Sequence, residues 1–175
     1  MARPKIKLGV DDIGESLMKT VPLTKNQLAI VDDEDFDRVN QWKWQAIPNR
    51  DKWYAKRSFN KNGIRVGVRL HRFIINAPCG MDVDHINGNT LDCRKTNLRI
   101  CNNSQNAQNR GKTKFNTSGY KGVSYKKKNH RWYSQIMLNK HNYHLGYFDS
   151  PEDAAIAYDK KAVELFGEFA NINFK

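Results

Sequence analysis

The stretch VDHINGNTLDCRKTNLRICNNSQNAQNR, residues 83–110, decides how the N-terminal half of the chain folds. It contains two short strand candidates and the turn signal between them, which are Val83–Ile86, Leu98–Cys101 and Asn87–Gly88. Ser104 can cap a following helix over Gln105–Arg110. The stretch therefore predicts two strands with an irregular connection, followed by one helix.

The same stretch carries side chains that suit phosphodiester hydrolysis. A histidine such as His85 can deprotonate water, because its ordinary pKa lies near neutral pH. A carboxylate such as Asp84 and an amide oxygen suit a hard divalent cation. Adjacent strand residues point to opposite faces, so Asp84 and His85 share one site only if the strand bends at Asn87–Gly88. Each residue also has a plain structural reading, as a surface pair or as turn and capping residues.

The charge distribution points to nucleic acid as the partner. The chain has 175 residues and a formal net charge of +12. Residues 93–148 contain 12 Lys and Arg residues and no Asp or Glu. A long acid-free basic block with interleaved aromatic residues is typical of proteins that bind a phosphate backbone. A solvated basic face is the alternative.

Upstream of this stretch the chain predicts short strands. Residues 1–20 are expected to be loosely ordered, and strand candidates follow between residues 21 and 72. They are Leu28–Val31, Trp53–Arg57 and Val66–Arg72, with a turn signal at Asn62–Gly63. Trp42 and Trp44 alternate around one lysine and are expected to pack in or near the core.

Downstream, a basic linker over residues 111–118 separates residues 1–110 from a second domain over residues 119–175. Three strands are predicted there, at Val123–Tyr125, Arg131–Met137 and His144–Phe148. Ser150 caps a helix over Pro151–Phe166, and Gly167 follows its end. The predicted class is α+β, with a three-stranded antiparallel sheet packed on one helix in the second domain.

The ordered set in the first half resembles the HNH homing endonucleases of the phage intron-encoded type. His85, Asn97 and Asn106 meet the family's spacing. The other matching segments are Pro22–Thr24, Ala29–Asp32, Tyr54–Ala55, Leu70–Arg72, Val83–Gly88, Asn97–Arg99 and Gln105–Asn106. The resemblance covers about residues 20–110 and implies a ββα-metal finger, in which two strands and a helix surround one ion.

Carried over to this chain, the resemblance implies a general base at His85. Asp84 and Asn106 would hold one Mg²⁺ or Mn²⁺, and Asn97 would hold the His85 segment in position. His71 is expected to pack, while Arg72 and Arg99 are candidate DNA contacts.

Some family branches bind a structural zinc through two CxxC pairs, which this chain lacks. No structural zinc is therefore expected, and Cys79, Cys93 and Cys101 are expected to be packed thiols.

The second half resembles the AP-two type DNA-binding domain of plant ethylene-response factors. The matching segments are Tyr120–Val123, Arg131–Trp132, Leu145–Gly146, Ala154–Ala155, Ala157–Asp159 and Asn173–Phe174. In that family the sheet reads the major groove of DNA. The candidate DNA contacts beyond residue 110 are Lys114, Lys121, Lys126, Lys128, Arg131, Trp132 and Tyr143. Ser124 stands where plant domains often carry an arginine, so their target sequence does not transfer.

Together the two resemblances imply a site-specific endonuclease acting on double-stranded DNA. A single finger would nick if the protein is a monomer on DNA, whereas a dimer could cut both strands. A non-catalytic DNA-binding regulator and an RNA-binding protein are the alternatives. No apolar run long enough for a membrane span and no secretory signal are found, so the expected location is the cytoplasm.

Overall fold

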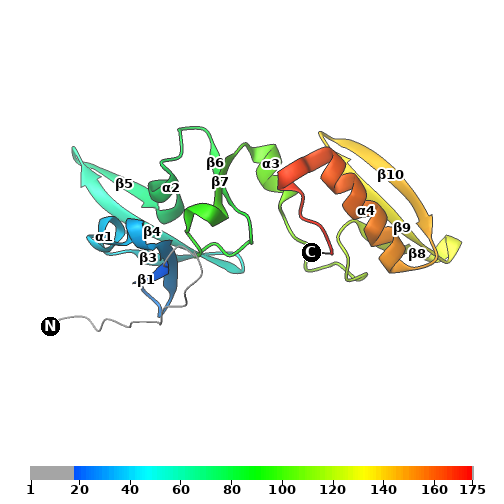
Figure 1. Ribbon diagram of the computed structural model, residues 1–175, viewed down its shortest axis with the longest axis horizontal. Helices are drawn as coiled ribbons and strands as arrows, with labels where there is room; N and C mark the ends of the chain where they lie inside the picture. Colours follow the sequence, from blue (N-terminus) through cyan, green and yellow to red (C-terminus); the bar gives the residue numbers. More distant parts are fainter. Residues whose placement is uncertain (1–17, 175) are drawn as a thin grey trace.

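The computed structural model describes residues 18–174, which form two lobes with one short helix between them (Figure 1). The elements up to this helix are β1 (Met18–Pro22), β2 (Leu28–Asp32), α1 (Asp33–Asn40), β3 (Gln45–Asn49), β4 (Lys52–Lys61), β5 (Ile64–Arg69), α2 (Leu70–Ile75), β6 (Asp82–His85), η1 (Lys95–Asn97), β7 (Leu98–Cys101) and α3 (Asn103–Gln108). Those of the second lobe are β8 (Val123–Lys126), η2 (Lys127–Asn129), β9 (Arg131–Leu138), β10 (His141–Phe148), α4 (Pro151–Phe166) and η3 (Gly167–Phe169). The mixed helix and sheet class is as predicted.

The first lobe is built from three small antiparallel sheets. They pair β1 with β2, β3 with β4 and β5, and β6 with β7. Residues including Val21, Val31, Trp44 and Leu70 form one shared core. The strand predictions at Leu28–Val31 and Trp53–Arg57 are confirmed. Residues 1–17 lie outside the described residues, but residues 18–20, expected to be loosely ordered, belong to β1.

Two short helices of this lobe were not predicted. The acidic residues Asp33, Glu34 and Asp35 occupy the first turn of α1, where they complement the positive end of the helix dipole. The predicted strand over Val66–Arg72 is wrong at its end, because α2 begins at Leu70. In such a short apolar run, the hydrophobic periodicity does not distinguish a strand from a buried helix.

The tryptophans and cysteines divide between core and surface. Trp44 is buried, whereas Trp42 is 45% exposed and lies beneath the guanidinium of Arg57, 3.8 Å from its ring centre. Cys93 and Cys101 are buried free thiols. Cys79 is an exposed free thiol, so the expectation that it packs is wrong. It lies in the loop between α2 and β6.

α3 starts earlier than predicted. Its cap is Asn102 rather than Ser104, because Asn102 and Gln105 form a reciprocal capping box. The Asn102 side chain accepts from the Gln105 amide, and the Gln105 side chain accepts from the Asn102 amide, each at 2.9 Å. The helix therefore begins at Asn103, directly after β7 ends.

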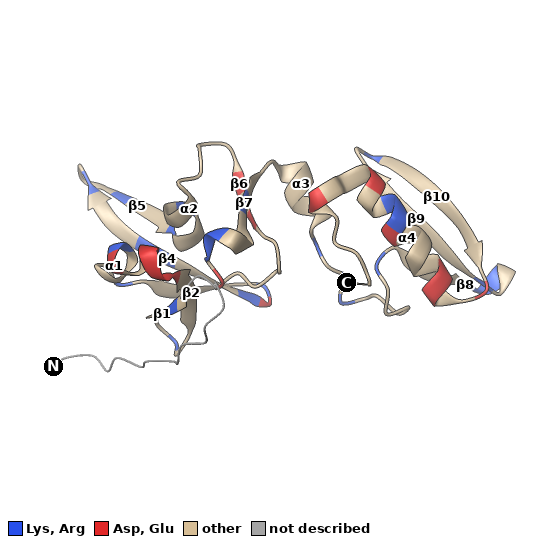
Figure 2. Ribbon diagram, in the orientation of Figure 1, with Lys and Arg blue, Asp and Glu red and all other residues tan. Residues whose placement is uncertain are grey.

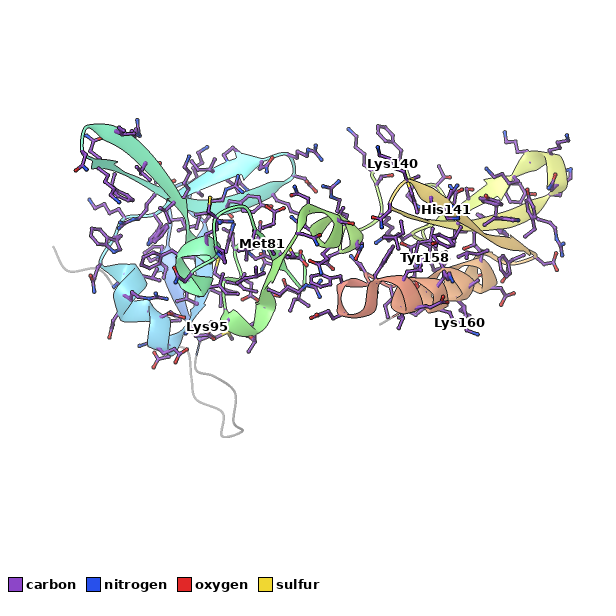
Figure 3. The ribbon with its side chains drawn as sticks, turned by 90° about the horizontal axis from the view of Figure 1, so that it is seen from above. Met81, Lys95, Lys140, His141, Tyr158 and Lys160 are labelled. Carbon is purple, nitrogen blue, oxygen red and sulfur yellow. The ribbon has the colours of Figure 1, made fainter. Side chains whose placement is uncertain are left out.

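The second lobe is an antiparallel sheet in the order β10-β9-β8, covered on one face by α4. β10 begins at His141, earlier than predicted, because Asn139 and Lys140 with positive φ make a two-residue hairpin turn. α4 has the predicted bounds, with Ser150 accepting a hydrogen bond from the Asp153 amide at 3.0 Å. Small residues on α4, including Ala154 and Ala155, let it lie close to the sheet. Tyr158 points toward the sheet, whereas Lys160 points away from it (Figure 3).

Candidate functional site

The β6–β7 hairpin and α3 gather the polar residues singled out by their spacing. In the register of the hairpin, Asp84 faces Arg99 and His85 faces Leu98. α3 packs against both strands and brings Asn106 to the same region. The local order of strand, strand and helix is therefore the predicted one.

Asn97 holds the connection between the two strands. Its Oδ1 accepts from the backbone N–H of Asn87 at 2.9 Å, and its Nδ2 donates to the carbonyl of Asp92 at 2.8 Å. The backbone N–H of Gly88 donates to the carbonyl of His85 at 2.8 Å, so the chain turns directly after the histidine. These contacts are those of a residue that fixes the His85 segment.

Asp92 is a second brace of this loop that sequence reasoning missed. Its carboxylate is buried, accepts from Nδ2 of Asn87 at 2.9 Å and pairs with Arg94 at 2.8 Å. Arg94 holds the pKa of Asp92 below its ordinary value, so the carboxylate is charged at neutral pH. The sequence signal for this role of Asp92 was its position two residues before an arginine, in a turn.

His85 is a buried imidazole with an unused nitrogen. Its Nε2 is buried and has no hydrogen-bond partner among residues 18–174. Burial lowers the pKa of His85 to about 4, against the opposing effects of Asp84 and Asp92. The ring is therefore neutral at pH 7, which is the form that accepts a proton.

His71 lies against His85, as the packing role expected for it requires. The two ring centres are 4.9 Å apart and the rings are nearly perpendicular. Burial lowers the pKa of His71 to about 3, so its ring is also neutral. Tyr54 completes an aromatic wall, with its ring edge-on to both histidines.

Asp84 is held on both of its oxygens. Oδ2 accepts from Nε and a terminal nitrogen of Arg99 at 2.9 and 2.7 Å, and only 7% of the Asp84 side chain is exposed. Oδ1 accepts from Nδ2 of Asn109 at 3.0 Å. Arg99 was expected to contact DNA, but its guanidinium pairs with the carboxylate of Asp84.

α3 and its C-terminal capping residue contribute two asparagines to this site rather than one. Nδ2 of Asn106 donates to Asp82 at 3.1 Å, while Asn109 donates to Asp84 and to the carbonyl of His85, both at 3.0 Å. Asp82 and Asp84 alternate along β6 and so share a face. Asn109 and Asp82 were missed, although the three-residue spacing of Asn106 and Asn109 on the predicted helix over Gln105–Arg110 was a usable signal.

Asp84 and Asn106 carry side-chain oxygens of the kind that hard divalent ions prefer as ligands. Oδ1 of Asp84 accepts one hydrogen bond and keeps a further lone pair, and Asn106 uses its amide nitrogen, not its oxygen, toward Asp82. Within residues 18–174 no three His, Cys, Asp or Glu side chains gather as a metal cluster. The donor set suits an ion whose remaining positions are filled by phosphate and water.

The outer face of the second sheet carries a cluster of aromatic and basic side chains. Tyr133 stacks on His144 with 4.8 Å between ring centres and contacts Tyr147 at 5.3 Å. The ammonium of Lys126 lies 4.8 Å from the centre of the Tyr133 ring. Strand alternation relative to Trp132 places Tyr133 on the opposite face of the sheet, away from α4.

Both predicted aromatic DNA contacts lie on the side of this sheet that α4 covers. Trp132 packs with Val123 and the alanines of α4, and Tyr143 packs beside Ile136. Arg131 is exposed and pairs with Asp149 at 2.8 Å. Asp and Glu residues lie along α4 on the covered side of the sheet (Figure 2). The basic residues of this lobe that can approach a phosphate backbone therefore include Lys126 and Arg131.

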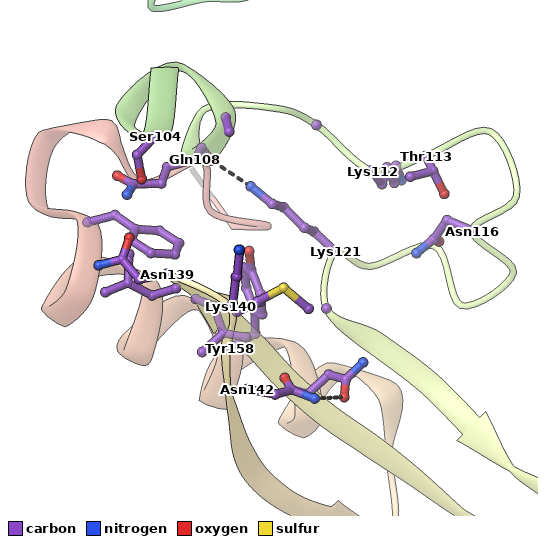
Figure 4. A pocket seen from close by; sticks show the side chains of 18 residues that line it. Ser104, Gln108, Lys112, Thr113, Asn116, Lys121, Asn139, Lys140, Asn142 and Tyr158 are labelled. Atoms are coloured by element: carbon purple, nitrogen blue, oxygen red, sulfur yellow. Dashed lines mark hydrogen bonds between the residues drawn. The ribbon is translucent and has the colours of Figure 1, made fainter. Parts of the chain in front are cut away.

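The remaining candidate DNA contacts differ in exposure. Lys114 and Lys128 are exposed, whereas Arg72 donates to the carbonyls of residues 77, 78 and 81 and so braces the loop before β6. Lys121 is half-buried beside a cavity of about 480 Å³ between α3 and the second sheet (Figure 4). Its ammonium donates to the carbonyl of Gln108 at 2.8 Å, and burial lowers its pKa to about 8.

Comparison with known proteins places these features in a family. A model described as HNH endonuclease matches residues 76–108, which span β6, β7 and α3. The "Uncharacterized HNH endonuclease L560" of Acanthamoeba polyphaga mimivirus is 33% identical over 145 residues, or 79% of this chain and 74% of the relative. "Protein 3.8" of Escherichia phage T7 is 34% identical over 93 residues, or 53% of this chain and 76% of that protein.

The C-terminal region has a different relative. The "Ethylene-responsive transcription factor ERF024" of Arabidopsis thaliana is 42% identical over 57 residues, which are 31% of this chain and 31% of that protein. No solved structure matches the chain. Within residues 18–174, no helix is long and apolar enough to cross a membrane.

The first lobe has a hairpin and a helix that present Asp, His and Asn side chains, and it is joined to a basic lobe built on a sheet. This combination is that of a nuclease-type protein with an added DNA-binding domain. The chain belongs to the HNH endonuclease family. Its C-terminal region is similar to AP2/ERF domains, and DNA is the partner that both similarities imply.

Proposed function

We propose that this protein is a site-specific DNA endonuclease of the homing type. The observation that carries the proposal is His85, a buried neutral imidazole whose Nε2 has no partner among residues 18–174, next to the held carboxylate of Asp84. A general base needs a free lone pair at neutral pH, and Asp84 offers a ligand for a cation beside it.

Each residue of the site has a proposed role. His85 takes a proton from the attacking water, and Asn97 keeps the His85 turn in place through its bonds to Asn87 and Asp92. Asp84 and Asn106 would hold one Mg²⁺ or Mn²⁺ in a ββα-metal finger. When bound, such an ion supplies charge neutralisation at the phosphate and at the leaving oxygen.

The second lobe supplies binding and register. We assign the nuclease to residues 1–110, a basic linker to residues 111–118 and the DNA-reading domain to residues 119–175. The outer sheet face with Lys126, Arg131 and Tyr133 lies against DNA, and exposed Lys114 and Lys128 contact phosphates. Linking two modest binding units raises their effective concentration on one DNA molecule and lengthens the recognised site.

A cleavage assay on supercoiled DNA containing the gene's own locus tests this function. We expect the wild type with Mg²⁺ to convert supercoiled DNA to open circles, because one finger in a monomer cuts one strand. His85→Ala should lose cleavage while binding the same DNA in a mobility-shift assay, and chelation with EDTA should stop the wild type.

Linear product from the wild type would instead indicate paired active sites. Cleavage by His85→Ala at the wild-type rate would remove His85 from the mechanism. Tight binding of this DNA without any cleavage by the wild type would favour the non-catalytic regulator.

A further inference from the structure

A short segment of the second lobe reaches into the nuclease site. We name Glu168, Phe169 and Asn171 the C-terminal clamp. Arg99 donates to the carbonyl of Glu168, and its guanidinium carbon lies 4.1 Å from the centre of the Phe169 ring. Nδ2 of Asn171 donates to the carbonyl of Asn109 at 2.8 Å. The clamp thus contacts two residues of the first lobe.

Those two residues are the ones that hold Asp84. Arg99 binds one carboxylate oxygen of Asp84 at 2.7 and 2.9 Å, and Asn109 binds the other at 3.0 Å. Asn109 also donates to the carbonyl of His85. Among residues 18–174, the hydrogen bonds to the Asp84 carboxylate come from Arg99 and Asn109, and the clamp contacts both of these residues.

The Arg99–Asp84 ion pair and the Phe169 ring are shielded from water, which strengthens their contacts. The side chains of Arg99 and Asp84 are 11% and 7% exposed, and Phe169 is 8% exposed. A charged hydrogen bond sheltered from water is stronger than one in solvent, and a planar guanidinium stacked on a ring has little freedom to rotate. Arg99 is therefore a fixed part of the site rather than a mobile surface arginine.

We propose that the C-terminal clamp positions Asp84 for catalysis, so that full cleavage requires the second lobe docked against the nuclease hairpin. This inference rests on the proposed function. Fixing both oxygens of Asp84 sets the direction of its remaining lone pair, and small errors in such a direction cost large factors in rate. Arg99, Asn109 and the clamp are positioning residues; none of them needs to touch the substrate.

Single-turnover cleavage by the full chain tests the inference. We expect Phe169→Ala and Asn171→Ala each to lower the cleavage rate in Mg²⁺ by about 10- to 100-fold, as loss of an outer support of a metal ligand does. DNA affinity, measured with Ca²⁺ replacing Mg²⁺, should stay within about twofold of the wild type, because the clamp acts on the chemical step. Phe169→Tyr keeps the ring and should restore the rate.

The control variant is Phe174→Ala. Phe174 is also an aromatic residue of the second lobe, and its contacts are made within that lobe: its ring centre lies 5.5 Å from that of Tyr120, and its backbone N–H donates to Asp159. We expect it to cleave at the wild-type rate. This comparison separates the clamp from a general weakening of the second lobe.

A second measurement tests the contacts of the clamp without measuring cleavage. In the NMR spectrum the Nε–H signal of Arg99, identified by its absence in Arg99→Lys, should shift and exchange faster in Phe169→Ala but not in Phe174→Ala. This signal reports the Arg99–Asp84 bond in the free protein.

Three results would overturn the inference. They are unchanged cleavage rates in both clamp variants, an unchanged Arg99 signal in Phe169→Ala, and equal losses of rate and DNA affinity. If the wild type cleaves and both clamp variants cleave at the same rate as it does, the inference fails but the proposed function does not. A wild type that binds its DNA but does not cleave in Mg²⁺ removes the proposed function and this inference together.

Discussion

At the scale of single residues, Lys121 is a predicted DNA contact whose side chain is instead half-buried between the lobes. Its ammonium donates to the carbonyl of Gln108 in the first lobe and lies 3.5 Å from the carbonyl of Asn171 in the second. Its position in the basic block suggested a phosphate contact, but a lysine that joins two backbone carbonyls between the lobes stabilises their junction. Charge along a sequence does not indicate which cations point outward.

The depressed pKa of Lys121 makes a prediction about stability and pH. Its pKa is lowered from 10.5 to about 8 by burial, so between these values unfolding takes up a proton. The free energy of unfolding therefore gains a contribution as the pH rises from 8 toward 10.5 and loses it as the pH falls through 8. We expect Lys121→Met to lack this gain in urea unfolding measured between about pH 7 and pH 10.

The comparison of wild type with Lys121→Met isolates this effect. Burial raises the pKa of Cys93 and Cys101, which lowers stability as the pH rises, but does so in both proteins. Burial also raises the pKa of Tyr158, and its effect begins only above its ordinary value of 10.0. Parallel stability curves for the two proteins would contradict the assignment.

The site residues were predictable only in part, and the reason is physical. Asp84, His85, Asn97 and Asn106 stand out through their spacing. The hydrogen-bond partners of Asp84 depend on how α3 packs on the hairpin. Local sequence patterns do not predict this packing. Asn109 and Arg99 were visible as residues, but their contacts arise from tertiary packing.

At the scale of elements, local chemistry decided which predictions succeeded. α4 was predicted with its bounds because a serine cap, a proline, acidic residues and a closing glycine all agree. β7 was predicted because apolar residues lie between turn signals. α1 and α2 have eight and six residues, too few for the helical period to stand out, and packing on the core selects them.

The contact of β8 with α4 depends on Gly122. A Cβ atom there would lie 2.0 Å from the Tyr158 ring, and φ is +77°. We expect Gly122→Ala to lower the free energy of unfolding by about 2–4 kcal/mol, from backbone strain and overpacking together.

Gly119→Ala is the matched control for that prediction. Gly119 has φ of +81° but open space around its Cβ position, so only strain of about 1 kcal/mol is expected. Urea unfolding followed by circular dichroism measures both variants. Equal losses would show that the close approach to Tyr158 adds nothing.

At the scale of the whole molecule, the two faces of the second lobe differ in their predicted response to salt. Lys126 and Arg131 lie on the outer face of the sheet, whereas Lys160 lies on α4 and points away from it (Figure 3). The logarithm of the binding constant falls as the logarithm of the salt concentration rises, and each phosphate contact makes this slope steeper by about 0.9.

We therefore expect Lys126→Gln with Arg131→Gln to lower the magnitude of that slope by about 2, and Lys160→Gln to leave it unchanged. Titration of labelled duplex DNA at several salt concentrations measures the slopes. An equal reduction by Lys160→Gln would place DNA on another surface of the lobe.

The loop between α2 and β6 offers a practical handle on this protein. Cys79 is its exposed thiol, while Cys93 and Cys101 are buried and have pKa values raised to about 12 and 11. The thiolate is the reactive form, so a maleimide dye should couple to Cys79 alone in the folded chain. Because Arg72 braces this loop close to β6, a fluorophore there would sit beside the hairpin and report the arrival of DNA without any engineered cysteine.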